Sequence, residues 1–143
     1  MTLPSLPYLA GFFDGEGSVG LYRNGQGHGS TLRVQITQNS SPRVDALLEA
    51  MKAHWGGSLS LMNRGRTRSA WNYQTSGEKA VQLLRDLRPH LILKAEQADV
   101  ALAWWDQKPE RTRGAAGRFD PTTPEAVAIT AEVDALLRRL KKE

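Results

Sequence analysis

The chain has 143 residues, of which 40% are hydrophobic and 24% charged, so we expect a single globular domain with one hydrophobic core. Its 19 Lys and Arg exceed its 15 Asp and Glu, and the net charge of +4 favours a polyanionic partner. The absence of cysteine excludes disulfides and thiolate metal sites. No apolar run resembles a signal peptide or a membrane span, so we expect no membrane partner and a cytoplasmic or organellar location rather than secretion.

A short glycine-rich helix is predicted near the N-terminus, over residues 8–13, after a proline that suits a first helical turn. Gly15 and Gly17 end this helix, because glycine readily adopts the conformations that terminate helices. Asp14 and Glu16 then lie at its carboxyl end, where the helix dipole disfavours negative charge by about 0.3–1 kcal/mol each. This cost indicates that the two acids have another purpose.

The same helix presents a face without side chains, because Gly11 and Gly15 are four residues apart. A bare face lets a second helix approach closely. Since the chain has only one such helix, we expect the partner to be its copy in a second subunit, related by a two-fold axis. The two Glu16 carboxylates would then converge, and divalent cations would relieve their repulsion. Carboxylate and carbonyl oxygens suit magnesium, so this helix predicts a homodimeric metal site.

A GxGxxG pattern, Gly15 to Gly20, overlaps the end of this helix. A dinucleotide-binding fingerprint follows a strand and begins a helix. Here the glycines end a helix and lead into a strand-like run at residues 19–22. We therefore expect no nucleotide cofactor.

The segment LAGFFDGEG, residues 9–17, resembles the signature motif of the LAGLIDADG homing endonucleases, in the single-motif class. The match consists of Leu-Ala-Gly, two apolar residues, Asp, a small residue, an acid and Gly. The resemblance implies that Glu16 binds the catalytic Mg²⁺, or another divalent cation such as Mn²⁺, together with the carbonyl of Gly15. It also implies a dimer interface formed by the motif helices, with contacts from Leu9, Gly11, Phe12 and Gly15.

A β-hairpin is predicted next, with strands at residues 18–24 and 31–38 that alternate between apolar and polar positions. Its polar face carries residue types that read base edges and phosphates. We expect DNA contacts from Gly20, Tyr22, Asn24, Thr31, Arg33, Gln35 and Thr37. Alternation is equally typical of an exposed, solvated sheet face, and only the resemblance favours recognition of DNA.

Ser41 and Pro42 predict the start of a second helix, with apolar residues at helical spacing as far as residue 55. A second hairpin follows, with strands at residues 58–62 and 70–75. We expect its inward positions to be Leu59, Leu61, Trp71 and Tyr73. Its loop holds arginines that either solubilise a turn or, if the sheet binds DNA, straddle the phosphate backbone. These are Arg64, Arg66 and Arg68.

Ser76 is predicted to cap a third helix, which ends before Pro89. The order of elements is then αββαββα, an α+β fold. The resemblance implies the homing-endonuclease-like arrangement, a curved antiparallel sheet with helices on one face and the other face free to enter a major groove.

Additional helices are predicted in the C-terminal part of the chain, at residues 96–106 and from residue 123 onward. An apolar stripe indicates that the last helix packs against the core, and it consists of Ile129, Val133, Leu136, Leu137 and Leu140. We expect one domain over residues 1–143, with a core from residue 5 to about 100 and a helical extension from about 101 to 143.

Two further segments match the family pattern. Gln38, at the end of the second strand, matches a position near the active site, and Lys94, the last residue of PHLILK, matches a lysine near the scissile phosphate. Outside this resemblance, each would be an ordinary exposed polar residue.

The sequence therefore predicts a homodimeric, Mg²⁺-dependent endonuclease of the intron-associated homing type, which cuts double-stranded DNA at a long pseudo-palindromic site. The catalytic residues would be Glu16, Gln38 and Lys94. The alternative is a catalytically silent protein on the same fold, either an RNA-binding intron maturase or a DNA-binding regulator. The joint presence of the three residues favours the enzyme, because a binding protein needs none of them.

Overall fold

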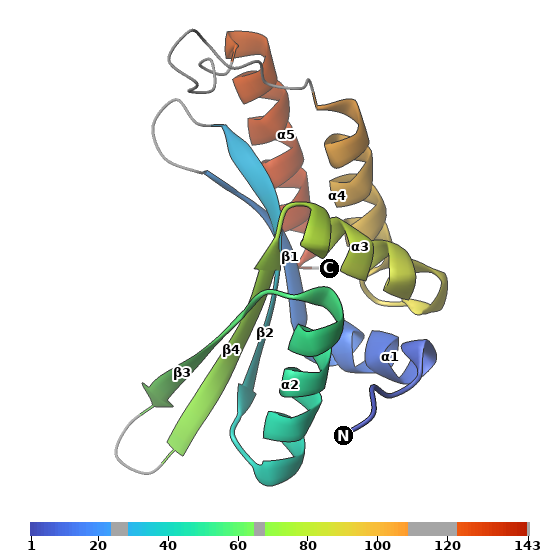
Figure 1. Cartoon of the computed structure of the whole chain (residues 1–143). Helices are drawn as coiled ribbons and strands as arrows, with labels where there is room; N and C mark the ends of the chain where they lie inside the picture. The colour runs from blue at the N-terminus through green and yellow to red at the C-terminus, as the bar shows by residue number, and fades with distance from the viewer. Residues whose placement is uncertain (24–28, 65–67, 109–122, 143) are drawn as a thin grey trace, which may run out of the picture.

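The structure is a computed structural model that describes residues 1–23, 29–64, 68–108 and 123–142 (Figure 1). Its elements follow the predicted order of helix, hairpin, helix, hairpin and helix, with additional helices at the C-terminus. In chain order they are α1 (Leu6–Glu16), β1 (Gly17–Arg23), β2 (Ser30–Asn39), α2 (Pro42–Trp55), β3 (Ser58–Arg64), β4 (Arg68–Ser76), α3 (Glu78–Leu87), the 3₁₀ turn η1 (Arg88–His90), α4 (Ala95–Gln107) and α5 (Pro124–Leu140).

The four strands form one antiparallel sheet in the order β1-β2-β4-β3, so the two hairpins lie side by side. The helices lie on one side of the twisted sheet (Figure 1). Burial alternates along β2, where Leu32, Val34 and Ile36 are buried and the residues between them are half-buried. The predicted α+β fold is therefore confirmed, with one sheet face against the helices and one face free of them.

Local capping explains where several helices begin. Ser41 Oγ accepts a hydrogen bond from the amide of Val44 (3.3 Å), and a proline occupies the first turn of α2. The prediction that Ser76 caps α3 is wrong, because Ser76 pairs with Arg33 at the end of β4. Gly77, with φ of 66°, makes the turn into α3 instead, and the helix has no side-chain cap.

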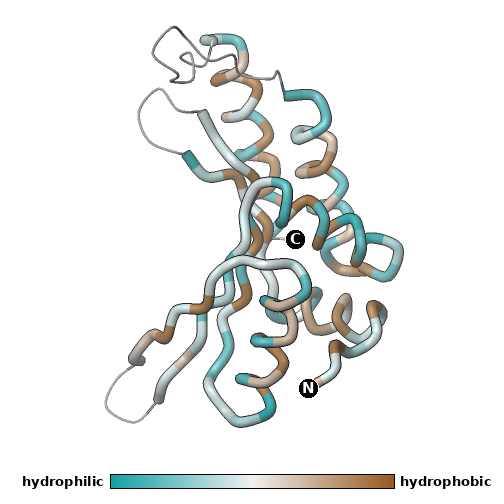
Figure 2. Tube along the Cα trace, in the orientation of Figure 1, coloured by the Kyte–Doolittle hydropathy of each residue, from teal (hydrophilic) through white to brown (hydrophobic). Residues whose placement is uncertain are grey.

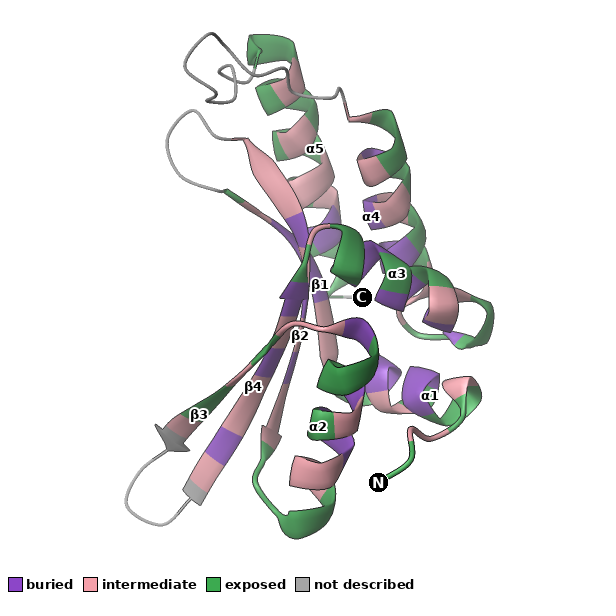
Figure 3. Ribbon diagram, in the orientation of Figure 1, coloured by how far each residue is buried: buried purple, intermediate pink, exposed green. Residues whose placement is uncertain are grey.

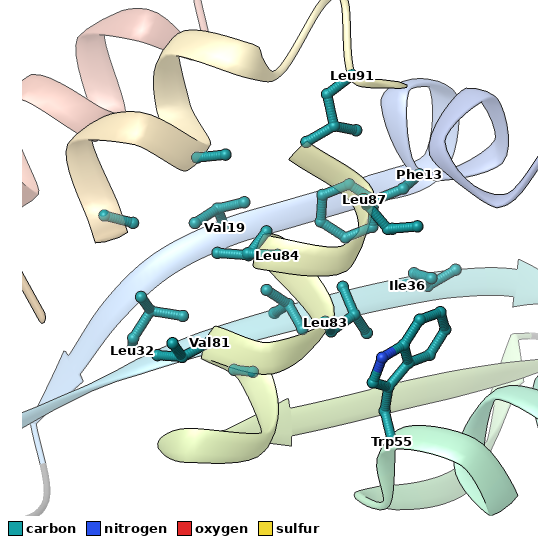
Figure 4. Close-up of a cluster of buried hydrophobic side chains, with 14 of the residues drawn as sticks. Phe13, Val19, Leu32, Ile36, Trp55, Val81, Leu83, Leu84, Leu87 and Leu91 are labelled. Atoms are coloured by element: carbon teal, nitrogen blue, oxygen red, sulfur yellow. The ribbon is translucent and has the colours of Figure 1, made fainter. Parts of the chain in front are cut away.

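The core fills the space between the sheet and the helices (Figure 4). Apolar and polar residues alternate along the elements that border it (Figure 2). Leucines of α3 face β1 and β2, and Phe13 of α1 lies near Leu87. The α1 helix is thus anchored in the same core as the sheet.

The inward positions predicted for the second hairpin are confirmed only in part. Tyr73 is fully buried and donates a hydrogen bond to the carbonyl of Gly56 (2.7 Å), and burial raises its pKa to about 12. Leu61 pairs with Trp71 and lies on the same sheet face as Tyr73, as predicted, but it is 53% exposed. The reason is topological, because β3 is an edge strand that extends beyond the helices.

The C-terminal helix α5 packs against α4 and β1. Leu137 is buried and Val133 is packed against the core, but Ile129 is 57% exposed, so the predicted stripe covers only the second half of α5. Figure 3 shows the first turns of this helix as mainly exposed. No helix in the described ranges is long and apolar enough to cross a membrane.

Candidate active site

The carboxyl end of α1 is joined to the segment before α4 by Asp14. Its buried carboxylate accepts hydrogen bonds from the backbone amides of Ile92 (2.8 Å) and Lys94 (2.9 Å). The Lys94 ammonium in turn donates to the backbone carbonyl of Asp14. A carboxylate that accepts two amide hydrogen bonds is well compensated for its burial. Asp14 therefore holds Lys94 against the end of the motif helix, a contact that no local sequence signal revealed.

Glu16 differs from Asp14, although only one residue separates them. Its side chain is exposed and makes no hydrogen bond or ion pair with any residue that the structure describes. As the last residue of α1 it lies where the helix dipole disfavours an anion. Nothing in the described part of one chain compensates this carboxylate.

Gln38 is brought toward the same end of α1 by the register of the sheet. The pairing of β1 with β2 ends at Gly17 and Ile36, so β2 continues past β1 for three residues, to Asn39. Gln38 lies in this continuation, where it is half-buried and pairs with Trp71 of β4. The register thus places Gln38 two positions beyond the partner of Gly17, the residue that follows α1, while Asp14 holds Lys94 at the end of the same helix.

The sheet face that the helices leave free carries an ordered polar network. The Tyr22 hydroxyl donates to Gln35 Oε1 (3.1 Å), and Gln35 Nε2 donates to Gln74 Oε1 (3.0 Å). The Arg33 guanidinium carbon lies 4.3 Å from the centre of the Tyr22 ring. Buried Arg33 Nε has no hydrogen-bond acceptor among the described residues. This network holds the side chains of three strands in one arrangement.

Two residues of this face were missed by the sequence analysis, Gln74 and Asn72 of β4. Asn72 Oδ1 accepts a hydrogen bond from Thr37 Oγ1 (3.5 Å), and Thr37 and Asn72 are directly paired. A signal was present, because Asn72, Gln74 and Ser76 alternate with Trp71, Tyr73 and Thr75 along β4. The neighbour of β2 across the sheet, however, is decided only by tertiary pairing.

Several expected DNA contacts are placed less favourably. Gly20 is buried, because the ring of Tyr22 covers it and a methyl group added there would lie 3.0 Å from Tyr22 Cε2. We therefore withdraw Gly20 as a contact residue. Thr31 is half-buried opposite Tyr22. The backbones of Arg64 and Arg68 pair at the ends of β3 and β4, and the contacts predicted for their side chains are not tested by the described structure. The predictions for Asn24 and Arg66 lie outside the described residues.

The outer face of α1 is open, as the glycine spacing predicted. A methyl group added at Gly11 or Gly15 would meet no atom of the described residues within 4 Å outside the neighbouring turns of α1, and both residues are exposed. Two apolar side chains in the segment that Asp14 binds are also exposed, with Ile92 at 82% and Leu93 at 74%. Leu9 points the other way and is fully buried in the core of its own chain. Its assignment to a subunit interface was therefore wrong.

One chain alone offers few metal ligands. No group of three or more His, Cys, Asp or Glu residues that could hold a metal ion occurs in the described part of the structure. At the end of α1, the available oxygens are the Glu16 carboxylate and backbone carbonyls. These are hard ligands of the kind that Mg²⁺ binds, but a single carboxylate makes at most half of a site.

No protein-family model matches the sequence, and neither does any curated protein sequence. Several solved structures are similar in fold. The homing endonuclease I-CvuI, in complex with the I-CreI target, has a TM-score of 0.66 and 19% identity, over 94% of this chain and 80% of its own. The homing endonuclease I-TnaI has a TM-score of 0.64 and 20% identity, over 99% of this chain and 96% of its own.

The meganuclease I-SmaMI, bound to uncleavable DNA, has a TM-score of 0.67 and 20% identity, over 94% of this chain but only 45% of its own. The present chain thus spans less than half of I-SmaMI and nearly all of I-TnaI. The LAGLIDADG homing endonuclease I-GzeII is similar as well, with a TM-score of 0.66 and 17% identity. The expectation from the motif is confirmed at the level of the fold: the chain has the fold of the LAGLIDADG homing endonucleases, and its sequence carries their motif once.

Proposed function

We propose that the protein is a homodimeric, divalent-metal-dependent endonuclease that cuts double-stranded DNA at a specific site. The observation that carries the proposal is the exposed carboxylate of Glu16, without an ion pair among the described residues, at the end of a helix that has a bare outer face and holds Lys94 through Asp14. A structural role within one chain explains none of these three features. A catalytic centre formed between two chains explains all of them.

The bare face supports the homodimer. Glycine in a helix interior costs about 1 kcal/mol relative to alanine, and α1 accepts this cost at Gly11 and Gly15, where its own chain leaves room for a side chain. Close approach of a second helix would explain why glycine occupies these two positions. Ile92 and Leu93 extend the exposed apolar surface beside α1, as a subunit interface requires.

The donor set fits a divalent cation once two chains are combined, since two Glu16 carboxylates and neighbouring carbonyls such as that of Gly15 are hard oxygen ligands. Such a cation, when bound, supplies Lewis acidity and activates water at the phosphate. The side chains around it have separate tasks. Lys94 carries the positive charge that offsets the negative charge developing on the phosphate, and Gln38 positions water through its amide.

The free sheet face is suited to bind the DNA. I-CvuI and I-GzeII, which share the fold, are solved in complex with DNA targets. On the corresponding surface of this chain, Arg33, Gln35 and Gln74 present donors and acceptors held by the network described above. A pre-ordered polar surface loses little side-chain entropy on binding, so it favours base readout over a loose electrostatic contact.

The test begins with a random duplex library, because the target sequence has to be found first. Purified protein selects duplexes by binding in Ca²⁺, and the bound pool is then transferred to Mg²⁺ or to EDTA. We expect double-strand cleavage at one position in Mg²⁺ and none in EDTA. Tight, sequence-specific binding without cleavage in Mg²⁺ or Mn²⁺ would instead establish the catalytically silent regulator, and selective binding of RNA would establish the maturase.

The same preparation tests the oligomeric state. The chain has a mass of 15.8 kDa, and light scattering should give twice that value at micromolar concentration. A monomer that cleaves both strands with full activity would contradict the proposed two-chain site.

A further inference from the structure

The end of the C-terminal helix reaches the candidate active site. After α5 ends at Leu140, the Lys141 ammonium donates a hydrogen bond to Ser18 Oγ (3.2 Å). Ser18 lies in β1, two positions after Glu16. The packing of α5 against β1 brings this lysine there, and Figure 1 shows the last turn of α5 beside the start of the sheet.

Lys141 lies in a positively charged environment. Although the residue is exposed, partial burial of its ammonium lowers its pKa, and the charges of Arg138 and Lys94 lower it further, while Asp134 acts in the opposite direction. Arg138 is paired with Asp134 (3.0 Å). Lys141 has no carboxylate partner within the described ranges, and its hydrogen-bond acceptor is a neutral hydroxyl.

Two ammonium groups from elements far apart in the sequence therefore lie close enough to repel each other, Lys94 at the end of α1 and Lys141 at the start of β1. Lys94 is held there by Asp14, and its own hydrogen bond goes to a backbone carbonyl rather than to a carboxylate. Like charges held together without a counter-ion are unfavourable in the free protein and become favourable when an anion lies between or beside them. A DNA phosphate is the anion that the proposed function brings to this place.

We infer that Lys141 binds the DNA backbone at the phosphates next to the cleaved bond, so that α5 completes the site opened by α1, β2 and the segment before α4. This inference rests on the proposed function for its ligand. It assigns the C-terminal extension a part in binding the reacting strand. The Ser18 hydroxyl holds the ammonium in position while the DNA is absent.

The test compares Lys141→Met with Lys142→Met, which removes the same charge from the next residue, also an exposed lysine, whose side chain makes no hydrogen bond or ion pair with any described residue. Binding of a selected duplex is measured in Ca²⁺ by fluorescence anisotropy at several salt concentrations. We expect Lys141→Met to lower the steepness of the salt dependence by about two released ions per dimer, one per chain. Lys141→Arg, which retains the charge, should keep the wild-type slope.

The position of the contact is found by replacing single central phosphates with neutral methylphosphonates. On unmodified DNA the wild type should bind more tightly than Lys141→Met. We expect this difference in affinity to vanish when one or two particular central phosphates are neutral, and to persist when any other phosphate is neutral. Cleavage by Lys141→Met in Mg²⁺ should fall about 10²-fold, the usual loss for one group that stabilises transition-state charge.

An equal loss of binding on every duplex, shared by Lys141→Arg, would show a structural role and overturn the inference. If Lys142→Met lowered the salt dependence of binding as much as Lys141→Met does, the inference would be overturned as well, because any terminal lysine could then make the contact. If the wild type binds but cuts no DNA, the proposed nuclease function fails, while the methylphosphonate series still decides for or against the phosphate contact.

Discussion

The two faces of α1 differ in their surroundings, since one is buried in the core and the other is exposed. On the inner face, Leu9, Ala10 and Phe13 are fully buried and Asp14 is nearly so, and each has partners in its own chain. On the outer face, Gly11, Gly15 and Glu16 are exposed and contact nothing that the structure describes. Folding of a single chain explains the inner face completely. The outer face is costly for a single chain, and the proposed dimer, metal and DNA would account for that cost.

The largest expected effect concerns Glu16 on the outer face. Glu16→Gln keeps the volume of the side chain and removes its charge, so cleavage in Mg²⁺ should fall by about three orders of magnitude or more, while folding and DNA binding persist. Single-turnover cleavage of a selected duplex, with binding measured in parallel, provides the check. Glu49→Gln, at an exposed position on α2, is the matched control and should cut normally. Near wild-type cleavage by Glu16→Gln would refute the assignment.

On the inner face, Phe13→Ala should affect stability instead. The ring is fully buried, and it occupies the space into which a methyl group at Gly17 would project. Its removal should lower the free energy of unfolding by about 3–5 kcal/mol, because a cavity remains in the core. Urea denaturation measures the loss, and Tyr8→Ala, at a residue that is 60% exposed, should change the unfolding free energy of the chain far less.

Asp14→Asn tests the contact between the inner face and the segment before α4. Each oxygen of the Asp14 carboxylate accepts one backbone N–H. Asparagine has an NH₂ group in place of one of these oxygens, and because NH₂ cannot accept a hydrogen bond, one of the two hydrogen bonds is lost. The expected cost is about 1.5–3 kcal/mol. Hydrogen exchange at the amides of Ile92 and Lys94 should accelerate selectively, and unchanged protection at both amides would show that Asp14 does not hold this segment.

The smallest effect, and the one that separates the two faces most sharply, is expected for Gly11→Ala. The added methyl group meets nothing within the chain, so α1 should gain up to about 1 kcal/mol of helix stability. The same group should weaken dimerisation, because it separates the two helices. Sedimentation and thermal unfolding at low concentration measure the two results. Gly17→Ala is the contrasting control and should destabilise each chain, since its methyl group would collide with Phe13. A dimer unaffected by Gly11→Ala would place the interface elsewhere.

Those features that depend on neighbours in sequence were determined by the sequence alone. The Ser41-Pro42 start of α2, the alternation of Leu32, Val34 and Ile36 and the order of the first seven helices and strands were predicted and confirmed. Capping, helical spacing and strand alternation act over a few residues, so a reader of the sequence sees them directly. The LAGFFDGEG motif also predicted the fold from the sequence alone, because its pattern of residues is specific to one family.

The tertiary structure decided everything that joins distant segments. It buried Leu9 in its own core, covered Gly20 with Tyr22, paired Gln35 with Gln74, and bound the segment before α4 to Asp14. It also brought the last turn of α5 to Ser18. These contacts depend on which strand neighbours which and on how the helices cross the sheet, and such choices minimise the free energy of the whole chain rather than of any local stretch.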